Sequence, residues 1–215
     1  MRKNGLDLRV MLSLLVLVLV AGAIALVAIP GSSGSKARAQ ALADHFEAAA
    51  VLEPAKPAPP LSLHNYLGQP VNIADYRGKA VLVTFLYTSC PDVCPLITSD
   101  LRVALNLMGP KTASKVRIVA VSVDPRGDTP KAVAAFLARH GMTGRMQYLI
   151  GSAKELGPVW KAWGVGAARD AAEPQFINHT GIVYGVTGSG KRLTLYASSF
   201  QPSEIAHDVP LLAAR

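Results

Sequence analysis

Two nearly continuous apolar runs constrain the fold more than any other feature of this sequence. They cover residues 80–88 (AVLVTFLYT) and 116–123 (VRIVAVSV), and residues 95–108 between them place apolar side chains at helical spacing. An apolar run without alternation indicates a strand that is buried on both faces, which is typical of parallel sheets covered by helices. We therefore expect a strand–helix–strand unit at the centre of the fold.

The segments that follow extend this pattern. The remaining expected elements are helices at residues 129–140, 152–163 and 202–212, and strands at residues 147–150, 181–186 and 192–197. Ser152 and Glu155 fit a capping box, whereas Pro158 should kink or shorten the helix that they begin. A strand–helix–strand unit, further helices, then a hairpin and a closing helix is the layout of a thioredoxin-like α/β sandwich.

A third apolar run, residues 10–29, precedes this domain. At about 1.5 Å per residue a helix of this length spans roughly 30 Å, which matches a bilayer core. Arg2, Lys3 and Arg9 come before the run, so residues 1–9 are expected in the cytoplasm and the rest of the chain beyond the membrane. The sequence thus predicts an N-terminal transmembrane helix and a single-pass protein of the inner (cytoplasmic) membrane.

A cleaved signal peptide is the alternative for this segment. Ala37-Arg38-Ala39 fits a small-x-small cleavage pattern, but the apolar run is longer than the usual 7–15 residues of a signal peptide. Either interpretation places the domain in the periplasm or another extracytoplasmic space, and we favour the uncleaved anchor. Residues 30–60 are rich in Gly, Ser, Ala and Pro and are expected to form a flexible tether, so the folded domain is predicted at residues 61–215.

The charge of the chain excludes one class of partner. The formal net charge is +8, but Lys36 and Arg38, together with the three cations before the apolar run, contribute much of it. No run of Lys and Arg with interleaved aromatic residues is present, so nucleic-acid binding is not expected.

The chain contains only two cysteines, Cys90 and Cys94, between the strand at residues 80–88 and the helix at residues 95–108. At a spacing of four residues both sulfurs can lie on one face of the first helical turn, where the helix dipole favours thiolates. Such a pair can form a disulfide or bind one metal ion, and the spacing alone does not decide between these roles. Two thiolates form a soft site that prefers Cu(I), and a histidine is the natural third ligand.

Four stretches of the domain resemble the Sco/SenC family of copper chaperones for cytochrome c oxidase assembly. They are residues 75–79 (DYRGK), 88–95 (TSCPDVCP), 123–130 (VDPRGDTP) and 178–180 (NHT), the last followed by Tyr184. The resemblance implies that Cys90, Cys94 and His179 bind copper as Cu(I), and also as Cu(II). It also implies that the protein supplies copper to the binuclear copper site of oxidase subunit II, or reduces the cysteines of that site, with a periplasmic copper donor or thiol reductant as a further partner.

Two positions depart from the family pattern. Asn178 stands where the family has an aspartate before the histidine, and Gly127 separates the Arg–Asp pair of the third stretch. A change beside the histidine affects how that ligand is oriented. We interpret Asp124 and Asp128 as loop and helix-cap residues rather than as site residues.

Three alternatives to a copper protein remain open. The first is a metal-independent thiol–disulfide oxidoreductase, in which Cys90 and Cys94 cycle between dithiol and disulfide. The second is a peroxiredoxin, although Tyr87 occupies the position three residues before Cys90 where that family has Thr or Ser. The third is a scaffold domain in which the cysteines have no chemical role.

Overall fold

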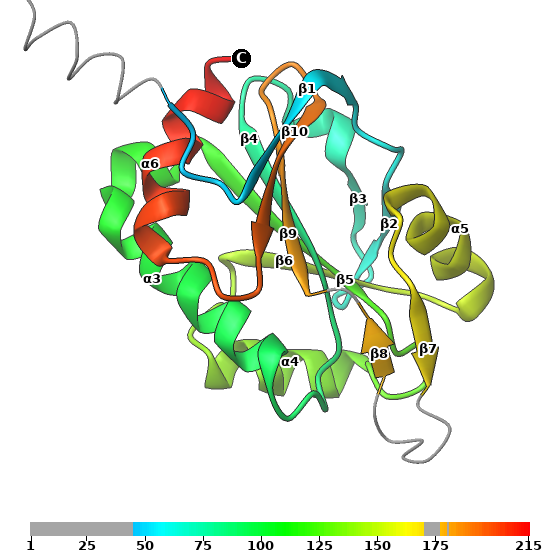
Figure 1. The fold of residues 1–215 in the computed structure, drawn as a ribbon. Coiled ribbons are helices and arrows are strands. Elements are labelled where there is room, and N and C mark those ends of the chain that lie inside the picture. Colours follow the sequence, from blue (N-terminus) through cyan, green and yellow to red (C-terminus); the bar gives the residue numbers. More distant parts are fainter. Residues whose placement is uncertain (1–44, 170–176, 180) are drawn as a thin grey trace, which may run out of the picture. The chain divides into compact units, whose positions relative to one another are not determined.

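A computed structural model of the protein describes residues 45–169, 177–179 and 181–215. The chain divides into two compact units, residues 1–45 and 46–215, and the second contains the elements below. Its centre is an eight-stranded sheet with the strand order β1-β10-β9-β4-β5-β6-β2-β3 (Figure 1). These strands are β1 (Ala50–Pro57), β2 (Ser62–Asn65), β3 (Pro70–Asn72), β4 (Ala80–Leu86), β5 (Val116–Ser122), β6 (Met146–Ile150), β9 (Ile182–Val186) and β10 (Lys191–Ala197).

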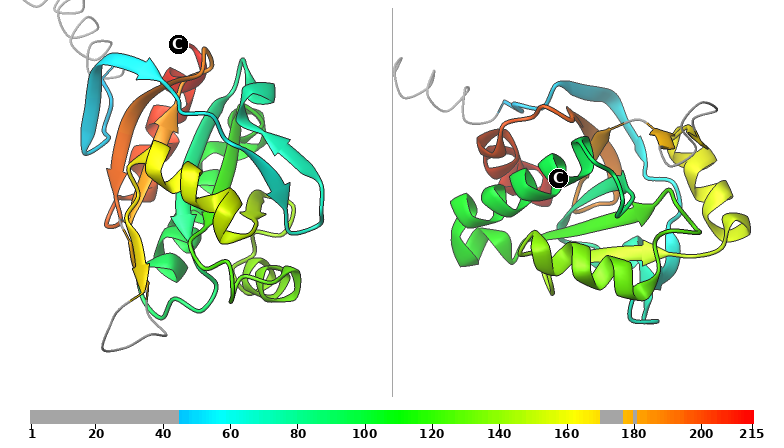
Figure 2. Two further views of the ribbon diagram at one scale, coloured as in Figure 1. Left: turned by 90° about the vertical axis from the view of Figure 1, so that its right-hand side faces the viewer. Right: turned by 90° about the horizontal axis from the view of Figure 1, so that it is seen from below.

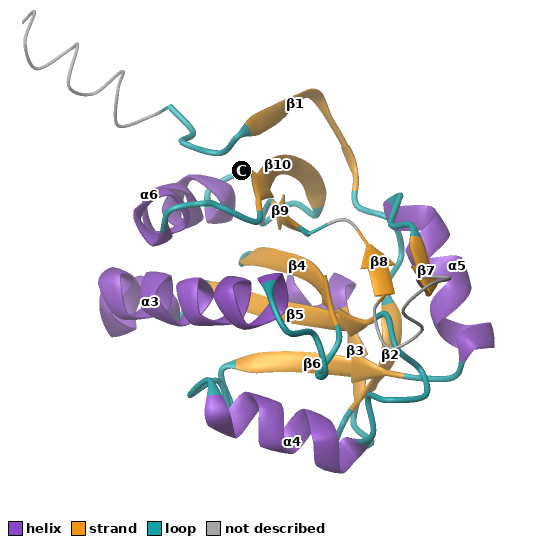
Figure 3. Cartoon of the chain, turned by 60° about the horizontal axis from the view of Figure 1, so that its bottom comes forward, coloured by secondary structure: helices purple, strands orange, loops and turns teal. Residues whose placement is uncertain are grey.

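A two-stranded sheet and the helices complete the unit. The small sheet pairs β7 (Ala167–Arg169) with β8 (Ile177–His179) in antiparallel orientation. The helices are η1 (Ile73–Tyr76), α3 (Val93–Ala113), α4 (Pro130–Arg139), α5 (Ala153–Trp163) and α6 (Pro202–Ala213). Helices α3 and α6 lie side by side on one face of the sheet, and α5 lies on the other face (Figures 2 and 3).

The two apolar runs form the central parallel pair, as predicted. Every residue of β4 is buried, and β4 pairs with β5 in parallel over its whole length. Strand β9 joins the other side of β4 in antiparallel orientation. Phe85 of β4, Trp163 of α5 and Tyr184 of β9 pack their rings together, with 5.3 Å between the centroids of Trp163 and Tyr184.

Two helices differ in length from the expectation. Helix α5 has the predicted capping box between Ser152 and Glu155, but it continues through Pro158 and ends only at Gly164, whose φ is 72°. Helix α3 extends beyond residue 108 because Gly109, with φ 66° and ψ 171°, makes a turn after which Pro110 begins one more helical segment. The glycine adopts this left-handed conformation without the steric cost of a side chain.

The predicted boundary at residue 61 is wrong, because the compact unit begins at Phe46. Residues 50–57, expected as tether, form β1, which pairs with β10 in antiparallel orientation. Pro54 lies where the register of this pair is irregular, between Val51 and Lys56. An edge strand tolerates proline at such a position because no ladder hydrogen bond is lost there.

The predicted membrane span at residues 10–29 lies outside the described residues. Within the described part of the chain, no helix has both the length and the apolar composition needed to cross a bilayer.

Candidate metal centre

The two cysteines lie where β4 leads into α3, at the carboxyl end of a central parallel strand. Strand β4 ends at Leu86, and α3 begins at Val93, so Cys90 lies in the connecting loop and Cys94 in the first turn of the helix. In Figure 1 this loop lies at the lower end of the view, near β7 and β8. Open α/β sheets commonly place their functional sites at this end of the strands.

The structure brings the two sulfur atoms into direct contact. Both cysteines are reduced and buried, with 8% of Cys90 and none of Cys94 exposed. The backbone amide of Cys94 donates a hydrogen bond to Sγ of Cys90 at 3.4 Å, because the start of α3 directs its amides toward the loop. The slightly exposed Cys90 is therefore the sulfur that an incoming metal ion or thiol meets first.

The contact divides the acidity of the pair unequally. A hydrogen bond from the Cys94 thiol, aided by the backbone amides of Asp92 and Cys94, lowers the pKa of Cys90 to about 5, against the opposing effect of burial. The same hydrogen bond and burial raise the pKa of Cys94 well above its ordinary value. At neutral pH the pair thus combines a thiolate at Cys90 with a thiol at Cys94, and thiolates are the metal-binding and nucleophilic form.

Tyr87 connects this loop to the strand that carries the predicted histidine. Its side chain is 3% exposed, and its hydroxyl accepts a hydrogen bond from the amide of Ile177 in β8 at 3.4 Å while it also contacts Cys90. His179 is the last residue of β8 and pairs with Ala167 of β7. The backbone strand of His179 is therefore held at the cysteine loop, whereas its imidazole and Asn178 side chain lie outside the described part of the structure.

Asp128 contributes to the site in a way that the sequence interpretation missed. The expected helix cap of α4 is supplied by Thr129, whose hydroxyl accepts from the amide of Ala132. The buried carboxylate of Asp128 instead accepts hydrogen bonds from the amide of Thr88 at 2.8 Å and from two hydroxyls, those of Ser122 and Tyr148, at 2.6 and 3.0 Å. Asp128 thus ties the start of the cysteine loop to β5 and β6, and burial raises its pKa.

Asp124 behaves as the loop residue that we expected. Its carboxylate accepts from the amide of Arg126 at 3.2 Å, which closes a local turn after β5. Tyr184, part of the fourth family-like stretch, is a core residue whose hydroxyl donates to the carbonyl of Trp163 at 3.0 Å. Among residues 45–169, 177–179 and 181–215, no group of three acidic, cysteine or histidine side chains is placed to hold a metal ion.

Comparison with known proteins decides which family has this arrangement. The model of the SCO1/SenC family matches residues 49–214. The chain belongs to the SCO1/SenC family. The matched residues agree with the compact unit that begins at Phe46. Solved structures of the family confirm the thioredoxin-like α/β fold.

Three SCO1/SenC relatives illustrate the similarity. The mitochondrial SCO1 homolog of Mus musculus is 27% identical over 154 residues, which are 70% of this chain and 54% of that protein. The copper-bound structure of ScoI from Bradyrhizobium japonicum is 29% identical with a TM-score of 0.61, and the match covers 71% of this chain and 97% of the other. BsSco, described as a cytochrome c oxidase assembly protein with a disulfide switch, is 26% identical with a TM-score of 0.62, over 76% and 97% of the two chains. This chain spans about half the length of the curated relatives that it matches.

Proposed function

We propose that this SCO1/SenC protein is a membrane-anchored copper-binding protein that delivers copper to the binuclear site of cytochrome c oxidase subunit II, or reduces the cysteines of that site. Copper, the cargo, is held by Cys90, Cys94 and His179. The observation that carries the proposal is the contact between two reduced, buried cysteines in a loop that Tyr87 hydrogen-bonds to the strand of His179. The copper in the related ScoI structure agrees with a soft two-thiolate site.

The local groups prepare the pair for a metal ion in two ways. Cys90 is ready as a thiolate, and the amide of Cys94 fixes the position of its sulfur. Cys94 keeps its proton until the metal arrives, so binding releases that proton and becomes tighter as the pH rises. Release follows by exchange of ligands, when thiolates of the partner replace Cys90 and Cys94 one after the other.

The cellular location follows from the sequence before the domain. Residues 10–29 are proposed to anchor the chain in the inner membrane, with residues 1–9 in the cytoplasm and the cysteine loop in the periplasm. The proposed partners in that space are oxidase subunit II and a copper donor or thiol reductant.

Metal analysis of the reduced protein, combined with absorption spectroscopy, tests the site. We expect Cys90→Ser and Cys94→Ser to abolish Cu(I) binding and His179→Ala to weaken it. His140→Ala is the matched control, because His140 packs against Phe136 at the end of α4 and contacts neither cysteine. Unchanged copper stoichiometry and affinity in His179→Ala would remove that residue from the site, and copper-free wild-type protein would end the proposal.

A thiol–disulfide oxidoreductase is the second candidate function. A low-pKa Cys90 beside a protonated Cys94 is the arrangement of an attacking and a resolving thiol, and a disulfide switch has been identified in the relative BsSco. In that case Cys90 attacks a partner disulfide, Cys94 then attacks the mixed disulfide, and the partner leaves as a dithiol while Cys90 and Cys94 become oxidised. Reduction of a model disulfide by the metal-free protein, with no copper retained, would favour this function.

A further inference from the structure

We propose that the end of the domain opposite the cysteine loop is a docking surface for anionic lipid headgroups. We call it the basal surface and define it by six cationic side chains, Lys79, Lys111, Lys115, Arg117, Arg145 and Lys191. The proposal rests on the membrane anchor proposed above and adds to it a fixed orientation of the domain. In Figure 1 this end lies at the top, with the C-terminus and the end of β1, where Pro57 pairs with Lys191, whereas β7 and β8 lie at the bottom.

Four of the cations gather around the connection from α3 to β5. The carbonyl of Ser114 accepts a hydrogen bond from Nζ of Lys79 at 3.3 Å and from Nη1 of Arg117 at 3.5 Å. The carbonyl of Lys115 accepts from the amide of Ala80, so the backbones that carry Lys79 and Lys115 run next to each other. Lys115 and Lys111 are exposed, which leaves their ammonium groups available to a ligand.

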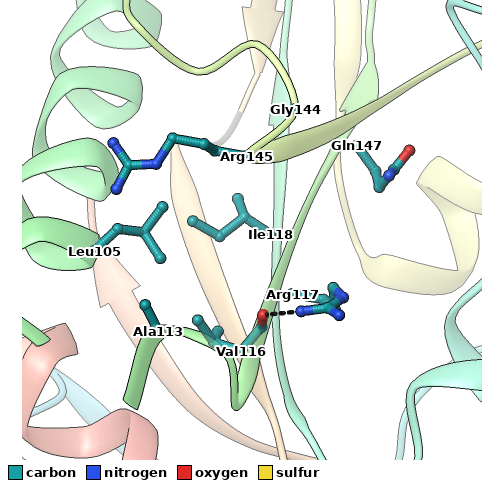
Figure 4. A pocket seen from close by; sticks show the side chains of 8 residues that line it. All are labelled: Leu105, Ala113, Val116, Arg117, Ile118, Gly144, Arg145 and Gln147. Atoms are coloured by element: carbon teal, nitrogen blue, oxygen red, sulfur yellow. Dashed lines mark hydrogen bonds between the residues drawn. The ribbon is translucent and has the colours of Figure 1, made fainter. Parts of the chain in front are cut away.

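A cavity of about 420 Å³ opens beside these cations (Figure 4). Leu105 and Ile118 give it an apolar floor, and Arg117 and Arg145 are among its lining residues. Nη2 of Arg145 donates to Oδ1 of Asn106 at 2.9 Å, which holds the guanidinium against α3. Guanidinium groups above an apolar floor suit the phosphate and glycerol region of a lipid.

An exposed leucine adds the apolar contact that interfacial binding requires. Leu107 follows Asn106 on α3, just before the turn at Gly109, and is 60% exposed. Surfaces that bind membrane interfaces combine cations with apolar side chains of this kind. Leu107 therefore distinguishes the basal surface from an ordinary solvated group of lysines.

The chain from the proposed anchor enters the domain at this same end. Phe46 is buried, and the guanidinium carbon of Arg215 lies 4.6 Å from the centre of its ring. The carbonyl of Arg215 accepts a hydrogen bond from the amide of Ser189 in the β9–β10 turn. That turn carries Lys191 into the basal surface and also contacts the backbone before Lys79, since the amide of Gly78 donates to the carbonyl of Gly188. Residues 30–45, which connect the anchor to Phe46, extend to at most roughly 55 Å.

Few acidic side chains oppose the cations of the basal surface. Asp75 and Arg117 both lie close to Tyr76, which makes Asp75 an acidic neighbour of the basal surface. Its single negative charge stands against the six cations of that surface. Asp92, Asp124 and Asp128 lie instead in the loops around the cysteines. An anionic membrane therefore attracts the basal surface, and binding at this surface turns Cys90 toward partners in the aqueous space.

Lysine labelling of the full-length chain in lipid nanodiscs tests the proposal. The discs contain phosphatidylcholine alone or phosphatidylcholine with phosphatidylglycerol, and mass spectrometry gives the acylation rate of each lysine. In the anionic discs we expect the rates of Lys111 and Lys115 to fall by about fivefold or more, because several cations bind headgroups together. Lys131 on α4 and Lys161 on α5 are exposed internal controls whose rates should not change.

A double substitution separates docking from general proximity to the bilayer. Lys111→Glu with Lys115→Glu should abolish the protection of Lys79 and Lys191, whereas Lys131→Glu with Lys161→Glu should preserve it. Protection that is equal in neutral and anionic discs, or that survives the basal substitutions, would overturn the proposal. Cu(I) stoichiometry, measured on the same variants, reports separately on the proposed copper function. A chain that fails to enter discs of either composition disproves the anchor. The docking surface is then tested by itself: binding of that chain to phosphatidylglycerol vesicles supports it, and no binding overturns it.

Discussion

The hydroxyl of Tyr87 accepts a hydrogen bond from the amide of Ile177, 90 residues further along the chain, at a distance of 3.4 Å. This contact joins the loop of Cys90 to β8, the strand that ends at His179. Because the same side chain contacts Cys90, one residue affects both the acidity of the sulfur and the position of the strand.

Tyr87→Phe removes the hydroxyl and keeps the ring. We expect the free energy of unfolding to fall by about 1 kcal/mol, the usual value of one hydrogen bond, and the pKa of Cys90 to rise because a hydrogen bond to its thiolate is lost. Urea unfolding and the pH dependence of alkylation measure the two effects. An unchanged pKa of Cys90 would show that the contact with Tyr87 does not stabilise the thiolate.

The unequal acidity of the cysteines predicts a specific pH profile. The pKa of about 5 means that the Cys90 thiolate is present above this pH and is lost as the pH falls through it. Alkylation of the reduced protein by iodoacetamide should therefore reach half of its plateau rate near pH 5, at Cys90. In Cys90→Ser the remaining Cys94 should react slowly throughout this range, because burial protects it. A midpoint near the ordinary thiol value of about 8.5 in the wild type would contradict the assignment.

Asp128 should stabilise the start of the cysteine loop. Asp128→Ala leaves the partly buried amide of Thr88 and the buried hydroxyls of Ser122 and Tyr148 without their acceptor, and we expect a loss of about 2–3 kcal/mol in the free energy of unfolding. Asp128→Asn is the matched control, since its amide oxygen can still accept from Thr88 and the loss should be smaller. Urea denaturation of both variants measures the difference, and equal losses would mean that this acceptor contributes little.

The raised pKa of Asp128 also predicts the sign of a pH effect. The carboxyl binds its proton more tightly in the folded chain than in the unfolded chain, so its ionisation costs stability as the pH rises above about 4. Asp128→Asn has no such ionisation. The stability of the wild type relative to this variant should therefore decrease from acidic to neutral pH, and a parallel pair of pH curves would count against the buried, shifted carboxyl.

The early start of the domain is testable at Phe46. This side chain is 5% exposed, and Phe46→Ala should reduce the free energy of unfolding by about 3 kcal/mol because it empties part of the core. Leu67→Ala, at a leucine that is 64% exposed, is the control and should have little effect. If both substitutions are equally mild, Phe46 belongs to the connecting segment rather than to the folded unit.

The sequence predicted the elements that have strong periodicity or clear caps. Strands β4 and β5 were identified because residues buried on both faces form apolar runs, and α5 because Ser152 and Glu155 signal its start. Strand β1 was missed because Pro54 and Pro57 are typical of a tether, and only its pairing with β10 shows that an edge strand accommodates them. The short strands β2 and β3 carry too few residues for a pattern to emerge.

Of the proposed site, the sequence predicted the proximity of the two cysteines, and the role of His179 stays a prediction. The spacing of Cys90 and Cys94 was sufficient to bring their sulfurs together, since the first turn of one helix fixes that geometry. The contacts of Tyr87 and Asp128 depend on tertiary neighbours from β8, β5 and β6, which local spacing does not reveal. One signal was available for Asp128: Thr129, directly before Pro130, can cap the helix by itself, which leaves the carboxylate of Asp128 free for another contact.

Strand β1 has a mechanical consequence for a domain that is attached through its first residues. A pull on the chain before Phe46 first loads the contact of Phe46 with Arg215 and the hydrogen bonds from the next two backbone amides to Asp208 of α6. Only then does it reach the outermost strand and the hydrogen bonds between β1 and β10. Strand β4, which leads to Cys90, is separated from β1 by two strands, β10 and β9. A force applied at the point of attachment therefore acts first on α6 and on the edge of the sheet, and not on the strand that leads to the cysteine loop.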